Sequence, residues 1–159
     1  MRKAGGTLGL AALTAALLIS GCGPAAIPGP LSIHAAGRAY LKDVAPDNQA
    51  YAAFYKLANT WTASTTAAQI QAGIAPLIAA DERFQAALTD TDWPASARAD
   101  IRRLAASVAT EIADLENMPN AGTEFLSVEW QQSWNQAGAT FTLRADMVRH
   151  DLALPPVKP

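Results

Sequence analysis

PASARADIRRLAASVATEIADLEN, residues 94–117, carries apolar side chains at every third or fourth position. Because an α-helix has about 3.6 residues per turn, this spacing places the apolar residues on one face. They are Ala97, Ile101, Leu104, Val108, Ile112 and Leu115. Asp92 precedes Trp93-Pro94, a pattern typical of a helix start. The stretch therefore predicts an amphipathic helix from Pro94 to Asn117.

Three further stretches repeat this spacing, at about 40–61, 66–88 and 123–152, the last with Thr123 as its candidate cap. Pro46 interrupts the first of them: it either kinks one long helix or divides it in two, with Asp47 capping the second part. No useful run of alternating apolar and polar residues predicts a strand. Four apolar faces joined by short turns predict an all-α domain, an up-down four-helix bundle with a proline-kinked first helix.

The N-terminus has the three parts of an export signal: the basic Met1-Arg2-Lys3, an apolar run over 8–19, and small residues before Cys22. The apolar run is too short to cross a hydrocarbon core, which needs ~20 residues. Ile19-Ser20-Gly21-Cys22 resembles the lipobox of bacterial lipoproteins, in which the cysteine thiol carries a lipid. The alternative is an ordinary signal peptide with an unrelated cysteine. Cys22 is the only cysteine, and an odd cysteine in an exported protein needs an explanation that lipidation supplies.

These features divide the chain into four parts. Residues 1–21 are predicted to be a lipoprotein signal peptide, and residues 22–31 a lipidated Pro/Gly tether. Residues 32–153 form the helical domain, and 154–159 a C-terminal tail. We expect the protein to be anchored by lipid to the cell membrane on its extracytoplasmic face.

Composition excludes several functions. The formal net charge is −2 and no basic run is present, so nucleic-acid binding is not indicated. Two histidines and one cysteine cannot supply a zinc site of three or four such ligands. The Glu-x-x-His pairs of di-iron bundles, the P-loop, the haem-attachment motif and Gly-x-Ser-x-Gly are all absent. We therefore expect no enzyme activity, no cofactor and no metal. Asp146 and His150 have ligand-like spacing, but a surface ion pair explains them as well.

Charged residues interrupt the apolar faces at three positions: Asp47, Asp81 and Arg144. Asp47 and Asp81 lie at equal sequence distances from Ser64, at the centre of the turn between their helices, so an antiparallel hairpin places them at one level. Two close carboxyl groups in a core require a shared proton or a cation. Arg144 is the first candidate partner in such a buried polar network, and Arg102 the second. Alternatively, Asp47 is only a cap and Asp81 faces water beside Glu82.

Trp130 and Trp134 lie one helical turn apart on the last apolar face. They are part of the core, or they line a ligand groove together with Tyr40, Tyr51 or Trp61.

The lipobox, the alanine-rich composition, the segment 40–48 (YLKDVAPDN) and Trp93-Pro94 together resemble small lipoproteins of actinobacteria and of the phages that infect them. The resemblance implies a location and an architecture but no reaction, because the members it brings together have no assigned activity. The leading hypothesis is a membrane-anchored, non-catalytic domain that binds an unknown protein or small ligand. A phage-derived superinfection-exclusion lipoprotein and a small-ligand or cofactor-binding bundle are the alternatives.

Overall fold

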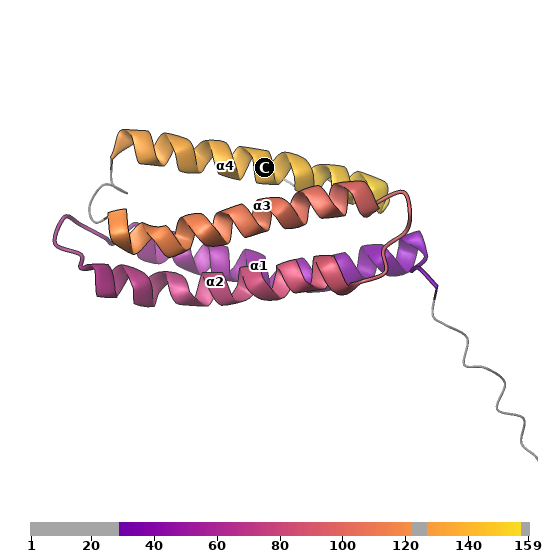
Figure 1. Cartoon of the computed structure of the whole chain (residues 1–159), viewed down its shortest axis with the longest axis horizontal. Coiled ribbons are helices and arrows are strands. Elements are labelled where there is room, and N and C mark those ends of the chain that lie inside the picture. Colours follow the sequence, from indigo (N-terminus) through magenta and orange to yellow (C-terminus); the bar gives the residue numbers. More distant parts are fainter. Residues whose placement is uncertain (1–28, 122–126, 157–159) are drawn as a thin grey trace, which may run out of the picture.

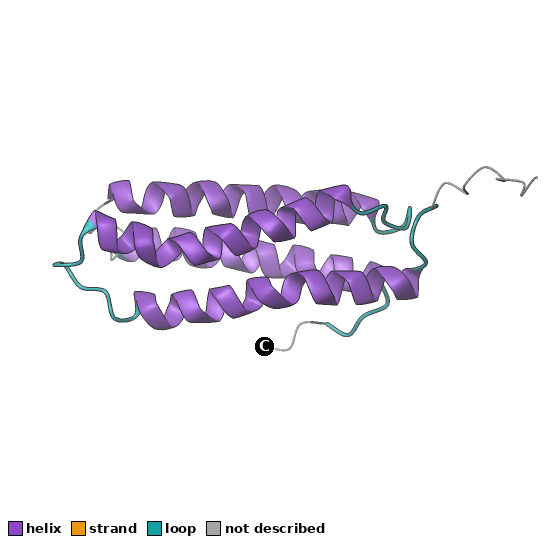
Figure 2. Ribbon diagram, turned by 90° about the horizontal axis from the view of Figure 1, so that it is seen from below, coloured by secondary structure: helices purple, strands orange, loops and turns teal. Residues whose placement is uncertain are grey.

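The computed structural model describes residues 29–121 and 127–156. Within these ranges the chain forms four helices and no strand: α1 (Ile33–Ala58), α2 (Ala67–Asp90), α3 (Arg98–Asn117) and α4 (Val128–Asp151). The helices lie side by side along their lengths (Figures 1 and 2). The prediction of an all-helical domain is confirmed. The signal peptide, Cys22, most of the tether and Thr123 lie outside the described residues.

Short polar side chains begin three of the helices. Ser32 accepts a hydrogen bond from the backbone N–H of Ala35, and Ser127 accepts one from Trp130. Thr66 and Gln69 form a reciprocal capping box at the start of α2. Each cap satisfies a backbone donor that would otherwise lack a partner in the first turn.

The structure corrects several expected helix boundaries. Helix α1 spans Ile33–Ala58 rather than about 40–61, and α4 begins at Val128 with Ser127, not Thr123, as its cap. Helix α1 runs uninterrupted through Pro46, so Asp47 lies inside a helix and caps nothing. Helix α3 begins at Arg98, not at Pro94, because the carbonyl of Pro94 first accepts the N–H groups of Ala97 and Arg98 in a turn. Trp93, just before this turn, is buried and donates its indole N–H to the carbonyl of Leu88 at 2.8 Å.

The core consists of two apolar clusters, one toward each end of the molecule. The first cluster joins the start of α1 to the ends of α2 and α4 and the start of α3; among its members are Tyr40, Val44, Phe84, Leu104, Val108 and Val148. The second cluster comprises Phe54, Ile70, Ile74, Leu77, Leu115 and Met118, with Trp61, Trp130 and Trp134 packed against it. Extensive helix contacts join α1 to α2, α2 to α3 and α3 to α4. Helix α4 buries only Ala145 and Val148, both in its second half.

The chain segments next to the helices are attached to this core. The N–H of Leu31, at the end of the predicted tether, donates to the carbonyl of Asp92 at 2.9 Å. After α4, Ala153 takes a positive φ of 53°, and the N–H of Leu154 returns to the carbonyl of Arg149. The side chain of Leu154 then lies against α1 at Gly37, where an added Cβ would meet it at 3.2 Å.

None of the helices in the described ranges has the length and hydropathy needed to cross a bilayer.

Candidate functional site

A layer of carboxyl groups lies between the two apolar clusters. Along α1, Asp47 follows Val44 of the first cluster and precedes Phe54 of the second. Asp81 lies between members of the two clusters on α2 in the same way, and Glu111 does so on α3. Asp47 is 4% exposed and Asp81 is 1% exposed. We call Asp47, Asp81 and Glu111 the carboxyl layer.

The structure brings the carboxyl groups of Asp47 and Asp81 close enough to affect each other's pKa. Burial, which disfavours the charged form, raises the pKa of both groups. Because the pKa of Asp81 rises to about 10, the pair holds one proton at neutral pH, which two such close carboxyl groups can share in a hydrogen bond. Oδ1 of Asp47 and Oδ2 of Asp81 are buried without a hydrogen-bond partner among the described residues. The alternative in which Asp81 faces water is therefore wrong.

Glu111 is the third member of the layer. The hydroxyl of Tyr51 lies near its carboxyl group and favours the charged form, but burial is the larger effect and raises the pKa of Glu111 to about 7. The same burial raises the pKa of Tyr51 above its usual range, so this hydroxyl stays protonated and remains the donor. Oε1 of Glu111 lacks a partner in the described part of the chain.

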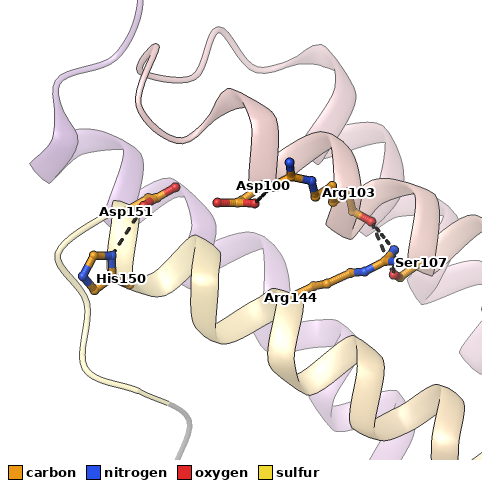
Figure 3. A network of polar contacts seen from close by, with 6 residues as sticks. All are labelled: Asp100, Arg103, Ser107, Arg144, His150 and Asp151. Atoms are coloured by element: carbon orange, nitrogen blue, oxygen red, sulfur yellow. Dashed lines mark hydrogen bonds and ion pairs between the residues drawn. The ribbon is translucent and has the colours of Figure 1, made fainter.

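Arg144 is not the cation that completes this layer. Its guanidinium reaches across to α3, where it donates to the hydroxyl of Ser107 and, at 2.9 Å, to the carbonyl of Arg103 (Figure 3). Arg102, the second candidate, has an exposed side chain. Asp47 and Asp81 therefore lie together as the sequence predicts, whereas Arg144 contacts α3 instead of the two aspartates.

Aromatic rings cover the layer on the side of α4. The ring of Tyr51 stacks on Trp134 with centroids 6.4 Å apart, and Trp134 stacks on Trp130 at 5.3 Å. Trp134 also contacts Phe54 and donates its indole N–H to the hydroxyl of Tyr55 at 3.3 Å. These contacts attach the first half of α4 to α1.

Two cavities flank α4 at the level of the carboxyl layer, and both are lined by Tyr51, Trp134, Gly138 and Phe141. The one beside α3 measures about 180 Å³ and is also lined by Glu111 and Arg144. The one beside α1 measures about 330 Å³; we call it the α1–α4 cavity, and Asp47 and Tyr55 also line it. Gly138 leaves this space open, since an added Cβ there would meet nothing within 4 Å.

The two alternatives for the tryptophans both hold in part. Trp130 and Trp134 are half-buried against the second apolar cluster. They also line a groove of about 240 Å³ together with Phe54, Tyr55 and Trp61. Tyr40 belongs elsewhere, because its ring packs on Phe84 in the first cluster.

The histidines lie away from this site. His34 is exposed, and His150, whose side chain is 90% exposed, pairs with the neighbouring Asp151 at 3.5 Å (Figure 3). Across residues 29–121 and 127–156, no group of three or more His, Cys, Asp or Glu side chains could hold a metal ion.

Comparison with known proteins identifies no relative, so the function is inferred from the residues described above. The chain matches no protein-family model, no curated protein and no solved structure.

Proposed function

We propose that this protein is a lipid-anchored, extracytoplasmic lipoprotein whose helical domain binds a small ligand and catalyses no reaction. The observation that carries the binding role is the α1–α4 cavity of about 330 Å³. Its volume falls at the small end of the ~300–1,000 Å³ common for ligand sites. Its lining combines aromatic faces with a few polar groups, which is also typical of such sites.

The packing of α4 supports the same role. In its first half, α4 presents half-buried aromatic rings rather than fully buried aliphatic side chains. Stability is lowest where few apolar groups are buried, and binding elements are commonly drawn from such regions. A small movement of this half-helix would open the cavity while the first apolar cluster stays packed.

The anchor rests on the sequence around Cys22. A diacylglyceryl group on its thiol supplies two chains, and two chains hold a protein on a membrane far more stably than one. The Pro/Gly tether that follows would keep the domain off the surface, so a ligand arriving from outside the cell would reach it.

We also propose that the helices form the up-down four-helix bundle expected from the sequence, with a bend in the first helix at Pro46. Consecutive helices pack as neighbours through short connections, as in that topology. Proline removes a backbone hydrogen bond and crowds the preceding turn, the usual cause of a bend.

Native mass spectrometry tests the binding role directly. The full chain, extracted in detergent from cells that produce it, should carry a bound small molecule. Trp134→Ala should lose that molecule, because the indole lines both cavities at the carboxyl layer. Leu143→Ala serves as the matched control, since Leu143 lies on the same helix, is 63% exposed and lines neither cavity. Equal loading of the wild type and Trp134→Ala would contradict the proposal.

A further inference from the structure

We propose that the α1–α4 cavity binds the head group of an organic cation, a quaternary or alkylated ammonium. This inference rests on the proposed binding function and names its ligand class. Four aromatic residues line the cavity, namely Tyr51, Tyr55, Trp134 and Phe141, together with Asp47. A cation over an open aromatic face is attracted by the ring quadrupole, as in the aromatic cages that recognise quaternary ammonium groups. Because Trp134 is already stacked on Tyr51 and Trp130, the cation would lie mainly against the rings of Tyr55 and Phe141.

The charges around the cavity also favour a cation. Asp47, which lines the cavity, has a buried oxygen with no hydrogen-bond partner in the described ranges. Among the described residues, no Lys, Arg or His lines this cavity. The cavity on the other face of α4 differs, because there the guanidinium of Arg144 partly offsets the carboxyl groups of Glu111 and Asp114. These contrasts assign the cation to the side of α1.

An organic cation fits this cavity better than a metal ion. A metal needs several oxygen, nitrogen or sulfur ligands at short range, and the described residues provide no such group. A trimethylammonium group needs instead an apolar surround and a nearby negative charge. Gly138 lines the cavity and leaves room there, since an added Cβ would meet nothing within 4 Å.

Isothermal titration calorimetry of the full chain in detergent tests the inference with three probes. Tetramethylammonium and choline carry the charge, whereas 3,3-dimethylbutan-1-ol has the shape of choline without it. We expect both cations to give a saturable heat and the alcohol to bind at least about tenfold more weakly. Equal binding of choline and the alcohol would overturn the cation assignment yet leave the proposed ligand-binding role standing. The absence of any cation binding would overturn the inference as well.

Variants locate the binding. Asp47→Asn keeps the side-chain shape and removes the negative charge of the pair, because burial keeps Asp81 protonated. The variant should therefore bind choline about tenfold or more weakly. Asp43→Asn is the matched control, because it removes the same charge one turn earlier on α1 from a residue that does not line the cavity. Equal affinity of these two variants for choline would contradict the assignment.

A second variant tests the space rather than the charge. Gly138→Leu fills the cavity from α4 and should abolish choline binding while the far-UV spectrum stays helical. Undiminished choline binding to Gly138→Leu would place the site elsewhere and overturn the inference.

Discussion

The substitution Asp81→Asn should stabilise the domain at neutral pH. In the wild type the Asp47–Asp81 pair is buried and shares a proton that the unfolded chain would release. An amide at position 81 can donate the same hydrogen bond to Asp47 without taking up a proton. The variant thus imitates the protonated pair but avoids the free energy of holding that proton.

The size of the effect follows from proton linkage. An unfolded aspartate has a pKa of 3.8. Holding one proton on the folded pair at about pH 7 therefore costs ~4 kcal/mol, and at about pH 4.5 it costs ~1 kcal/mol. Because burial raises the folded pKa, wild-type stability is greatest below the unfolded pKa and falls as the pH rises. We expect Asp81→Asn to gain roughly 2–4 kcal/mol at neutral pH, and little at the acidic pH.

Urea denaturation followed by far-UV circular dichroism measures this difference. The full chain and Asp81→Asn are unfolded in the same detergent at both pH values. Glu82→Gln is the matched control: it removes a carboxylate from the adjacent, exposed residue and should change stability by less than ~0.5 kcal/mol. A stability difference between the wild type and Asp81→Asn that does not depend on pH would refute the shared proton.

Three further outcomes are expected. Cys22→Ala should abolish partitioning into the detergent phase on cloud-point separation; unchanged partitioning would exclude a lipid on Cys22. Gly73→Ala should destabilise the domain by ~1–3 kcal/mol in thermal melts, because the new Cβ would meet Leu57 at 2.7 Å and Trp61 at 2.8 Å. An unchanged melting temperature would show that these two side chains move aside freely. Ala153→Gly should stabilise the domain by ~0.5–1 kcal/mol, because Ala153 follows the C-cap residue Leu152 at φ 53°, where glycine is unstrained. A lower melting temperature would contradict this account of the helix end.

Much of the scaffold could be predicted from the spacing of apolar residues. The end of α3 at Asn117 matches the sequence pattern, and α2 begins beside Thr66 as expected. The start of α3 could not be predicted as well. Pro94 has the local signature of a first helical turn, but the burial of Trp93 and the bond from its indole to Leu88 hold this segment in a separate turn.

The site could be predicted only in part. Equal distances from one turn were enough to pair Asp47 with Asp81, because a hairpin of two helices fixes their level. Glu111 was missed, although it continues the stepping of Leu104 and Val108 toward Leu115, since Ile112 beside it also fits the apolar face. The position of Arg144 depends on the rotation and distance of α4 relative to α3, which apolar spacing along one helix does not determine.

The measurement that tests the binding cavity most directly is the response of the tryptophan indole resonances to choline. Proton–nitrogen NMR spectra of the full chain in detergent resolve the indole N–H groups, which single Trp→Phe variants assign. The indole of Trp134 lines the α1–α4 cavity, whereas that of Trp93 is bound to the carbonyl of Leu88 in the first apolar cluster. We predict that choline shifts the Trp134 resonance saturably and leaves that of Trp93 in place. A Trp134 resonance that does not move, or equal shifts of both, would contradict a ligand site between α1 and α4.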